Sequence, residues 1–355
     1  MLALVTGAGG FLGRYVCEQL RARGDEVRGF ARGDYPELAA IGVDLRRGDL
    51  GDRDAVAAAV EGVDCVFHVG GKVGVWGRWF DYFRANVHGT LNVLSACEAH
   101  CVTRLVFTSS PSVTFDAARR DCDQRCVGAD AAYPTRWLAH YPHSKALAEE
   151  FVITQDNTPV AGAAGEDRRL RTTSLRPHLV WGPRDHHLTR RLIERARAGQ
   201  LKRVGPGGNR VDTVYVENAA EAHLLAADEL ARPEPKNAGK AYFVTQDEPV
   251  DCWKWIDEVL ALVDLPPVKK HVSARLAYYA GAALEAKHWL TRDWDNEPKM
   301  TRFVARSLAT DHWFERGDAE RDFGYRPSVS TEEGMRRLGE WLRETIAEGG
   351  WRSAE

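Results

Sequence analysis

The sequence predicts an α/β protein built on a doubly wound parallel sheet, with a smaller, partly interleaved C-terminal lobe. Short apolar runs alternate with amphipathic, helix-like stretches over the first hundred residues, which is typical of a parallel sheet covered on both faces. A glycine-rich turn follows the first of these runs. The length of 355 residues is enough for two lobes at roughly 150 residues per domain.

The expected strands are short apolar runs, and the expected helices are longer stretches with one apolar face. In chain order, strands are predicted at Leu2–Val5, Glu26–Phe30, Cys65–Val69, Leu105–Thr108, Thr172–Leu175 and Val214–Val216. Helices are predicted near Phe11–Arg23, Asp54–Val60, Ala85–His100 and Ser144–Thr154. Residues 155–171, with Ala-Gly pairs and several charges, are expected to form a surface excursion.

Composition excludes several classes of protein. The chain has 48 Lys+Arg and 51 Asp+Glu, a formal balance of −3, so it lacks the basic excess of a nucleic-acid binder. No uncharged apolar run approaches the ~18 residues that cross a bilayer, and no basic segment of a secretory signal follows Met1. Seven scattered cysteines argue against a disulfide framework. These observations predict a cytoplasmic protein.

A glycine-rich turn lies between the first strand and the first helix. It reads Thr6-Gly7-Ala8-Gly9-Gly10-Phe11-Leu12-Gly13, with the spacing Gly-x-x-Gly-x-x-Gly on residues 7, 10 and 13. Gly7 supplies the tight turn, Gly10 lets the backbone approach a pyrophosphate, and Gly13 lets the helix pack close to the strand. The turn therefore predicts a site for a dinucleotide cofactor.

The segment after the second strand indicates which dinucleotide binds. A NAD-preferring site has Asp or Glu there to hold the ribose 2′-hydroxyl, but the corresponding residue is Ala31, followed by Arg32. A guanidinium can bind a 2′-phosphate with two nitrogens, so NADP(H) is the predicted cofactor, with NAD(H) as the alternative. Asp49 and Leu50 follow the next strand-like run, where a carboxylate commonly meets the adenine. Asp49 can equally be a helix cap.

These segments define the expected domains. Residues 1–180 are predicted to form an NADP(H)-binding Rossmann domain, completed by about 211–245. After about residue 177 the regular alternation is lost, and short helices, Gly/Pro turns and a Trp-rich tail follow. Residues 181–210 and 246–355 are therefore assigned mainly to a substrate-binding lobe.

The segment Tyr141-Pro142-His143-Ser144-Lys145 carries the candidate chemistry. A Tyr and a Lys four residues apart on a helix lie on one face, although such a pair can also be an ordinary helix face. A phenol has a pKa near 10, and a neighbouring ammonium together with a positive nicotinamide favours the phenolate and lowers that pKa. Lys145 can also hydrogen-bond the nicotinamide ribose. A hydroxyl of Thr108-Ser109-Ser110, at the end of a strand, can hydrogen-bond a substrate carbonyl.

Together these motifs resemble the extended short-chain dehydrogenase/reductase superfamily over essentially the whole length. The resemblance implies Tyr141 as proton donor or acceptor and Lys145 as its electrostatic partner. It also implies that Ser110 orients the carbonyl and that Asn86 is a positioning residue; the choice of Ser110 over Ser109 rests on alignment. The matching motifs are Gly7-x-x-Gly10-x-x-Gly13, Tyr82-x-x-x-Asn86-Val87-x-Gly89-Thr90, Thr108-Ser109-Ser110 and Tyr141-x-x-x-Lys145.

The motifs and the resemblance together give a set of expected cofactor-binding residues. They come from the glycine turn, from the ends of neighbouring strands and from the helix that carries the tyrosine. The set is Gly7, Gly9, Gly10, Phe11, Leu12, Gly13, Arg32, Asp49, Leu50, Val69, Gly70, Gly71, Thr108, Tyr141, Lys145, Pro177 and Val180.

Within the superfamily, the closer likeness is to the 3β-hydroxysteroid dehydrogenase-like branch, on residues 141–145 and 214–219. Residues 72–77, 108–113, 181–185 and 298–303 further resemble bacterial 2-alkyl-3-oxoalkanoate reductases of long-chain olefin biosynthesis. This likeness implies reversible hydride transfer from NADPH to the 3-keto carbon of a lipid-like 2-alkyl-3-oxoalkanoic acid. Tyr141 would protonate the oxygen to give the 3-hydroxy acid. A 3β-hydroxysteroid dehydrogenase is the alternative within the branch.

Two functions outside this branch stay open. Nucleotide-sugar epimerases and dehydratases share the cofactor chemistry, but their Arg-Asp-Tyr motif is replaced here by residues 211–213, Val-Asp-Thr. Arg210 is adjacent but would point elsewhere on a strand, because side chains alternate between faces. Some members of this fold bind NADP(H) as non-catalytic sensors. The complete set of Ser110, Tyr141 and Lys145 favours an enzyme.

The expected partner is a hydrophobic small-molecule substrate. Lys72, Ser110 and Arg184 are candidates for binding it, although each cation is also explained as a solvated charge. Residues 274–290 form a helix-like stretch that can line an alkyl tunnel, rest on a membrane surface or pack on its own core. A homodimer is expected, with peripheral membrane contact or a pathway enzyme as further partners, and with neither nucleic acid nor a membrane span.

No metal site is predicted. Cys122-x-x-x-Cys126 lacks Cys or His partners at ligand spacing, and the adjacent His186 and His187 would point in different directions. His140 and His143 flank Tyr141 and either tune it or simply pack. The sequence does not indicate the role of the loop at 115–135.

Overall fold

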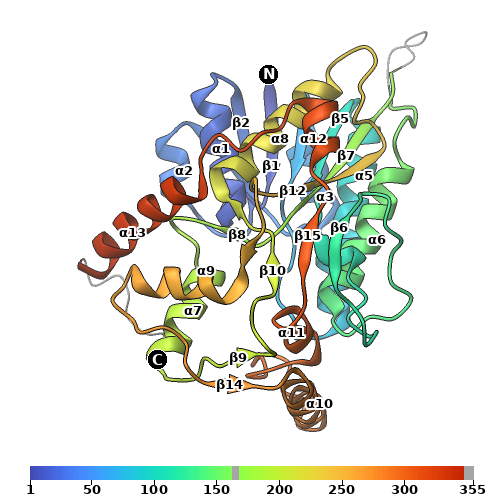
Figure 1. Ribbon diagram of the computed structural model, residues 1–355. Helices are drawn as coiled ribbons and strands as arrows, with labels where there is room; N and C mark the ends of the chain where they lie inside the picture. The colour runs from blue at the N-terminus through green and yellow to red at the C-terminus, as the bar shows by residue number, and fades with distance from the viewer. Residues whose placement is uncertain (162–167, 348–355) are drawn as a thin grey trace.

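A seven-stranded parallel sheet forms the centre of the structure, a computed structural model that describes residues 1–161 and 168–347 (Figure 1). The strand order β12-β7-β5-β4-β1-β2-β3 reverses direction between β1 and β4. Ligands bind in such sheets at the crevice beyond the carboxyl ends of the two strands at the reversal. The predicted α/β fold class is confirmed. The strands are β1 (Leu2–Thr6), β2 (Glu26–Ala31), β3 (Val43–Arg47), β4 (Cys65–His68), β5 (Arg104–Thr108), β7 (Arg171–Pro177) and β12 (Lys240–Val244).

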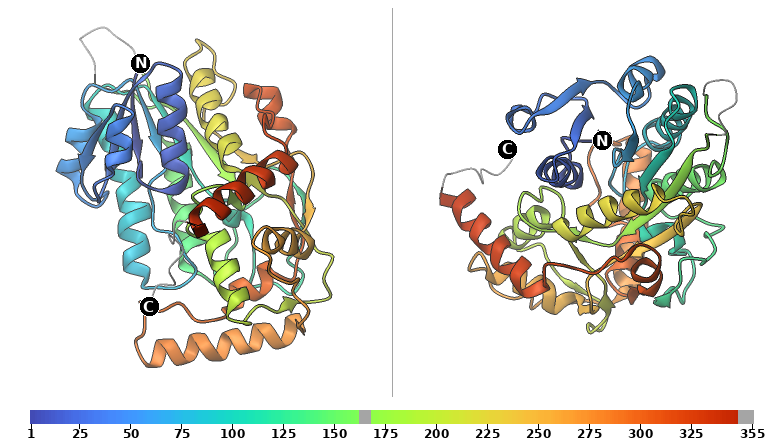
Figure 2. Two further views of the ribbon diagram at one scale, coloured as in Figure 1. Left: turned by 90° about the vertical axis from the view of Figure 1, so that its left-hand side faces the viewer. Right: turned by 90° about the horizontal axis from the view of Figure 1, so that it is seen from above.

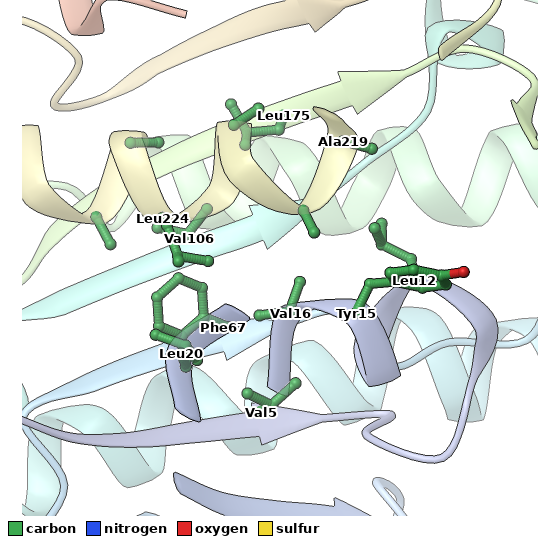
Figure 3. Close-up of a cluster of buried hydrophobic side chains, with 14 of the residues drawn as sticks. Val5, Leu12, Tyr15, Val16, Leu20, Phe67, Val106, Leu175, Ala219 and Leu224 are labelled. Carbon is green, nitrogen blue, oxygen red and sulfur yellow. The ribbon is translucent and has the colours of Figure 1, made fainter. Parts of the chain in front are cut away.

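Alternation along the buried strands divides the core into two layers. On β1, Ala3 and Val5 face one side of the sheet and Leu4 faces the other, because successive strand side chains point to opposite faces. Figure 3 shows Val5 and Phe67 of the sheet in one cluster with Leu20 of α1 and Leu224 of α8. The helices on this face are α1 (Phe11–Ala22), α8 (Val216–Leu230) and α12 (Gly317–Phe323); those on the other are α3 (Arg53–Val60), α5 (Gly89–Ala99) and α6 (His140–Thr154).

The second lobe has its own aromatic core and a small mixed sheet. Trp181, Trp253 and Trp255 are buried together, with the two indoles of Trp181 and Trp255 edge to face at 5.8 Å. Its sheet has the order β13-β10-β15-β6, and two strand pairs, β11-β8 and β14-β9, flank it. The strands are β6 (Gln124–Val127), β8 (Val180–Trp181), β9 (Arg203–Val204), β10 (Arg210–Val211), β11 (Val214–Tyr215), β13 (Val250–Asp251), β14 (His271–Val272) and β15 (His312–Phe314).

Helices enclose this lobe, and one of them lies at its outer edge. The left view of Figure 2 shows α10 (Ala274–Leu290) running along the base of the molecule, on the side away from the N-terminus. None of the helices in residues 1–161 and 168–347 is both long and apolar enough to cross a membrane. The other helices here are α7 (Leu188–Arg197), α9 (Cys252–Ala261), α11 (Arg302–Ser307) and α13 (Thr331–Ala347).

Several local expectations need correction. The helix predicted at Ala85–His100 is preceded by a short helix, α4 (Trp79–Tyr82), and its first turns are a π-helical segment, η1 (Phe83–His88). The loop at 115–135 contributes β6, which pairs with β15 nearly 190 residues later in register His312 to Gln124. The helix α2 (Pro36–Ala40) was not predicted from the sequence. Residues 162–167 of the predicted surface excursion lie outside the described residues.

Candidate active site

The glycine turn begins where β1 ends and leads directly into α1. Gly7 has a φ of +67°, and a Cβ there would stand 2.6 Å from the Cα of Gly70. A Cβ on Gly13 would stand 2.2 Å from the carbonyl oxygen of Gly7, so only glycine allows this close contact of turn and helix. Gly10 precedes α1 and supplies no side-chain cap, so the first N–H groups of the helix stay available to an anion. The turn therefore fits the pyrophosphate of a dinucleotide.

Two arginines, Arg32 and Arg47, lie beside the end of β2, and the sequence predicted only Arg32 as a cofactor-binding residue. β2 ends at Ala31, which pairs in register with Arg47 of β3, so Arg32 and Arg47 come from the same corner of the sheet. Arg32 is exposed, and Arg47 forms an ion pair of 3.2 Å with Asp34. Arg47 was missed because it lies on a strand that carries no nucleotide-binding motif.

The ring of Tyr35 covers the glycine turn and was also missed. A Cβ on Gly9 would stand 2.0 Å from the Cζ of Tyr35, so the half-buried ring lies directly on the backbone of Gly9. A larger residue at position 9 would displace this ring. Glycine at position 9 is therefore required by the contact with Tyr35 as well as by the turn.

Asp49 and Leu50 lie beside the cleft, and the helix-cap alternative for Asp49 is wrong. The cap of α3 is Asp52, whose carboxylate accepts from the backbone N–H groups of Asp54 and Ala55. Asp49 instead accepts from Gly51 N–H at 2.8 Å and lies 3.5 Å from an Arg84 nitrogen. Leu50 packs against Gly70, where its Cδ1 would be 3.1 Å from an added Cβ.

The helix α6, which carries Tyr141 and Lys145, begins one residue before Tyr141. Burial raises the pKa of the Tyr141 phenol above its usual value of 10, and a hydrogen bond with Ser110 opposes this rise. The net effect of the protein's own groups is thus a raised pKa of Tyr141, whereas the sequence predicted that Lys145 and a positive nicotinamide together lower it. A further contribution from a positive nicotinamide stays a prediction.

Lys145 lies one turn further along the same helix and is almost fully buried. Its Nζ donates a 2.6 Å hydrogen bond to the carbonyl oxygen of Thr108 and stands 4.5 Å from the ring centroid of Phe107. Burial lowers its pKa to about 8, and the carboxylate of Glu149 acts in the opposite direction. An ammonium has three donors, so two remain after the bond to Thr108.

Of the two serines at the end of β5, Ser110 is the neighbour of Tyr141. Its hydroxyl shares a 2.8 Å hydrogen bond with the hydroxyl of Ser112 and accepts from Ser112 N–H, which caps the short helix η2 (Pro111–Thr114). Ser109 is buried, and its N–H donates to the carbonyl oxygen of Leu175. The geometry thus favours Ser110 as the residue that contacts a substrate carbonyl.

Asn86 joins two parts of the site. Its side-chain amide accepts from Lys72 N–H at 2.6 Å and donates to Lys72 C=O at 2.9 Å and to the Ser144 hydroxyl at 2.8 Å. Ser144 lies between Tyr141 and Lys145 on α6, so the loop after β4 and the catalytic helix are held by one side chain. Asn86 lies on the π-helical segment, and such segments are frequent at functional sites.

A buried chain of hydrogen bonds runs from the glycine turn to Asn86 through His68. This chain was not predicted from the sequence. Gly70 N–H donates to the Thr6 hydroxyl, and Thr90 donates to the carbonyl oxygen of Asn86 at 2.6 Å. Between them, His68 Nδ1 lies 2.7 Å from Thr6 and Nε2 lies 2.9 Å from Thr90. The Thr90 hydroxyl donates to Asn86 and therefore accepts from Nε2–H of His68, and in the neutral ring Nδ1 then accepts from Thr6. Burial and the nearby Lys145 lower the pKa of His68 to about 3.

A buried ion pair anchors α6 to β7, and it too was missed. Arg176 donates to the Glu149 carboxylate through Nε and a terminal nitrogen, the latter at 2.6 Å, and both residues are at most 2% exposed. Tyr133 and Ser174 each donate a further 2.8 Å hydrogen bond to this carboxylate. Glu149 lies one helical turn beyond Lys145, so this pair also fixes the helix face that carries Lys145.

The loop after β4 and the segment after β7 complete the surroundings of the site. A Cβ on Gly71 would stand 2.9 Å from Asn86 Oδ1 and 3.5 Å from Lys145 Nζ, so Gly71 lies beside both. Val69 and Gly70 precede it in the same loop. Pro177 is the last residue of β7, and Val180 pairs with Val214 in the strand pair β11-β8.

The two candidate substrate cations have different environments. Lys72 is half-buried, with its Nζ 5.3 Å from the ring centroid of Tyr82 and its backbone held by Asn86. Arg184 does not fit the expected role, because both terminal nitrogens donate to the Glu18 carboxylate at 2.6 and 2.8 Å. Its guanidinium also lies 4.0 Å from the Tyr15 ring centroid and thereby joins the second lobe to α1.

The residues at the position of the nucleotide-sugar motif do not form a diphosphate clamp. Val211 is buried in the aromatic core of the second lobe. Arg210 is exposed on the opposite side of the strand and donates to the carbonyl oxygen of Pro249 at 2.9 Å. The alternation of side chains along β10 thus turns the Arg210 guanidinium away from the buried face that holds Val211.

The cysteine and histidine side chains considered as possible metal ligands have other environments. Cys122 is buried and Cys126 is exposed, and both are free thiols. Within residues 1–161 and 168–347, no group of three or more His, Cys, Asp or Glu side chains is arranged to hold a metal ion. His143 stacks between Trp79 and Trp137, with ring centroids at 4.7 and 5.3 Å, and therefore packs beside Tyr141.

A glycine turn at a sheet reversal, with Ser110, Tyr141 and Lys145 at the same edge, defines an oxidoreductase of the short-chain dehydrogenase/reductase class that uses a nicotinamide dinucleotide. Residues 4–272 match the 3-beta hydroxysteroid dehydrogenase/isomerase family, and the chain belongs to this family.

Individual relatives narrow the likeness further. The chain is 48% identical to the 2-alkyl-3-oxoalkanoate reductase of Shewanella oneidensis, over 95% of this chain and 85% of the relative. It is also 48% identical to the enzyme of the same name from Stenotrophomonas maltophilia, over 95% of this chain and 98% of the relative. In fold, it is similar to the dTDP-glucose 4,6-dehydratase DesIV of Streptomyces venezuelae, with a TM-score of 0.73, 21% identity and 99% coverage of both chains.

Proposed function

We propose that the protein reduces the 3-keto group of a lipid-like 2-alkyl-3-oxoalkanoic acid to the 3-hydroxy acid, with NADPH as the reductant and in a reversible reaction. The observation that carries this proposal is the 48% identity, over nearly the whole chain, to two 2-alkyl-3-oxoalkanoate reductases. The buried Val211, in the position where nucleotide-sugar enzymes have an arginine, speaks against a sugar diphosphate substrate.

The proposed reaction adds one hydride and one proton across the carbonyl group. The glycine turn of Gly7, Gly10 and Gly13 would hold the dinucleotide, and bound NADPH would supply the hydride that adds to C3 and would become NADP⁺. The Tyr141 hydroxyl donates the proton to the carbonyl oxygen, and in the reverse direction the phenolate accepts it. The raised pKa of Tyr141 keeps its proton in place at neutral pH, as the direction of reduction requires. Ser110 holds the carbonyl oxygen beside the phenol by a second hydrogen bond.

Lys145 and Asn86 have supporting roles in this mechanism. The ammonium of Lys145, fixed by its bond to Thr108, stabilises negative charge that develops on the Tyr141 oxygen during proton transfer. Asn86 is a positioning residue, since it touches the backbone of Lys72 and the Ser144 hydroxyl. Lys72 is the cation proposed to bind the carboxylate of the substrate, because Asn86 holds its backbone beside the catalytic helix.

The proposed preference for NADPH rests on the end of β2. Ala31 places no carboxylate at the end of β2, and Arg32 and Arg47 supply two guanidinium groups at this corner, of which that of Arg47 is paired with Asp34. Arginine binds phosphate with paired nitrogens and keeps its charge at every physiological pH.

One experiment separates the proposed substrate from its competitors. The purified protein is supplied with NADPH or NADH and with a 2-alkyl-3-oxo acid, a 3-ketosteroid or a UDP-sugar, and cofactor oxidation is followed by absorbance. We expect turnover of the 2-alkyl-3-oxo acid with NADPH at a kcat/KM at least tenfold above that with NADH. Turnover of the 3-ketosteroid alone would replace the proposed substrate by a sterol, and equal use of both cofactors would contradict the proposed preference.

A further inference from the structure

The outer face of α10 is the most apolar exposed surface on any single helix of the described chain. Leu276, Tyr279, Trp289 and Leu290 are 62%, 59%, 63% and 74% exposed, and with Phe80 they are the five most exposed large apolar side chains in the described residues. Leu276, Tyr279 and Leu290 follow helical spacing with Ala280 and Ala283, which are also exposed. We call the surface of Arg275, Leu276, Tyr279, Ala280, Ala283, Lys287, Trp289 and Leu290 the α10 outer face.

The opposite side of α10 is firmly packed, so this exposure is a fixed property of the fold. A Cβ on Gly281 would stand 2.6 Å from the backbone of Thr301, which places α10 in direct contact with the start of α11. The buried Glu285 accepts from the backbone N–H and from Nε of Arg302, both at 2.6 Å. The Arg306 guanidinium lies 4.7 Å from the ring centroid of Tyr278. The apolar residues of the outer face are therefore not needed to attach the helix.

The charges on the outer face are all positive. α10 carries one acidic residue, Glu285, and it is buried in its pair with Arg302. The exposed charges on the helix are Arg275 and Lys287, and the exposed Lys269, Lys270 and Arg292 flank its two ends. Asp295 is the exposed acidic residue that follows. Apolar residues bordered by cations match the surface of an anionic bilayer, into which such a helix inserts one face while lying flat.

We propose that the α10 outer face docks the protein on an anionic lipid surface. Three further observations support this occupant over a second copy of the chain. In a twofold dimer the same face meets itself, so Arg275 and Lys287 would oppose like charges. The left view of Figure 2 shows α10 along the outermost edge of the molecule, and exposed apolar side chains occur near both of its ends, at Leu276 and Leu290. Its 17 residues also do not form a membrane-spanning segment.

The proposed docking surface is connected to the candidate active site. The Trp76 indole donates to the carbonyl oxygen of Asp293 at 2.9 Å and stacks on Trp294, with ring centroids 5.6 Å apart. Trp76 belongs to the same loop as Lys72, whose backbone Asn86 holds beside the catalytic helix. The loop that borders the site is thus attached just beyond the C-terminal end of α10, so docking would bring a lipid-like substrate to the substrate side of the cleft.

The test is co-sedimentation with vesicles of phosphatidylglycerol and, separately, of phosphatidylcholine. Two double variants test the apolar and the electrostatic contributions to vesicle binding. They are Leu276→Ser with Leu290→Ser, and Arg275→Glu with Lys287→Glu. The matched control is Ile41→Ser with Ile346→Ser, since both isoleucines are exposed and lie away from α10, Ile41 directly after α2 and Ile346 on α13. We expect the unmodified protein and the control to bind phosphatidylglycerol, and both α10 variants to lose at least tenfold in bound fraction.

Three readouts make the result decisive. Thermal melting shows that each variant is folded, and NADPH oxidation with a short, water-soluble substrate should be unchanged. Sedimentation velocity records the oligomeric state: an α10 variant that dissociates a dimer would assign this face to a second copy and overturn the proposal. Failure of the unmodified protein to bind phosphatidylglycerol would overturn it as well. Vesicle binding is measured without turnover, so the docking proposal and the proposed reaction can fail independently of each other.

Discussion

Lys145 Nζ and the carbonyl oxygen of Thr108 are 2.6 Å apart, so the catalytic helix is bonded to the last residue of β5 through its lysine. The next two residues of that segment are Ser109 and Ser110, and Thr108 is itself held by a 2.7 Å hydrogen bond from its hydroxyl to His223. The lysine therefore fixes the distance between the strand end that carries Ser110 and the helix that carries Tyr141.

Replacing Tyr141 by Phe removes the proposed proton donor and leaves the ring. We expect kcat to fall by about 10²–10⁴-fold, the usual contribution of a positioned acid. The dissociation constant for NADPH, measured by fluorescence titration, should change by less than threefold. Unchanged NADPH oxidation in this variant would instead point to a different acid or to a non-catalytic dinucleotide sensor.

Lys145→Met should reveal a cost of burying the ammonium. The folded-state pKa of about 8 lies below the ordinary value of 10.5, so the charged lysine destabilises the folded protein at pH below 8. This cost fades as the pH rises from about 8 toward 10.5. The difference in unfolding free energy, parent minus variant, should therefore increase between pH 7 and pH 10 in denaturant titrations. A difference that stays constant with pH would contradict the depressed pKa. Activity should fall by at least about 100-fold at pH 7.

Glu149→Gln should destabilise the protein strongly, because it leaves the buried Arg176 charge without its partner. We expect a loss of about 3–5 kcal/mol in unfolding free energy. The double variant Glu149→Leu with Arg176→Met should lose less, since no buried charge remains. In the parent, the lowered pKa of Glu149 contributes stability that is present above about pH 4.5 and is lost as the pH falls through the folded-state value. A single variant as stable as the parent would show that this pair does not anchor α6.

Asn86→Ala removes the three hydrogen bonds that join Lys72 to Ser144. We expect a loss of about 1–3 kcal/mol in stability from the unpaired backbone groups of Lys72. The kcat should fall by about 10-fold or more, and Asn86→Ser should recover less than half of it. Thr154→Ala is the control. Thr154 lies at the exposed end of α6, the helix that carries Ser144, and its hydroxyl bonds only to backbone carbonyl oxygens. Equal kcat in parent and Asn86→Ala would remove the positioning role.

Arg32→Ala should weaken NADPH and spare NADH. A lost guanidinium–phosphate contact costs about 1.5–3 kcal/mol, so the dissociation constant for NADPH should rise by roughly 10-fold or more, while that for NADH changes little. Arg46→Ala is the matched control, since Arg46 is an exposed arginine on the neighbouring strand that pairs with Asp44. A parallel rise for both cofactors would assign Arg32 a structural role.

Local patterns predicted the parts of the site that depend on short spacing. Gly7, Gly10 and Gly13 lie within one turn and one helix start, and Tyr141 and Lys145 share a helix face, so spacing alone relates them. The same reasoning failed for Arg184, because its partner Glu18 is 166 residues away in the sequence. It also missed Glu149 with Arg176, since an acid in a helix and an arginine in a strand carry no periodic signal of their pairing.

In the fold as well, elements that depend on local sequence were predictable, and pairings between distant segments were not. The parallel sheet was predictable because each βαβ unit repeats along the chain. The small sheet was not, since its strands are two to four residues long and come from distant segments. The buried chain through His68 was missed for a related reason: Thr6, His68 and Thr90 meet only when β1, β4 and α5 are packed together.

The pairing of β6 with β15 has a mechanical consequence. β6 belongs to the segment between the serine and the tyrosine of the site, while β15 lies only about 40 residues from the end of the chain. A displacement of the outer lobe would therefore also move β6, which lies in the segment between Ser110 and Tyr141. Removing the chain from His312 onward would leave β6 without its partner strand, while the bond between Lys145 and Thr108 would still hold the strand end beside the helix.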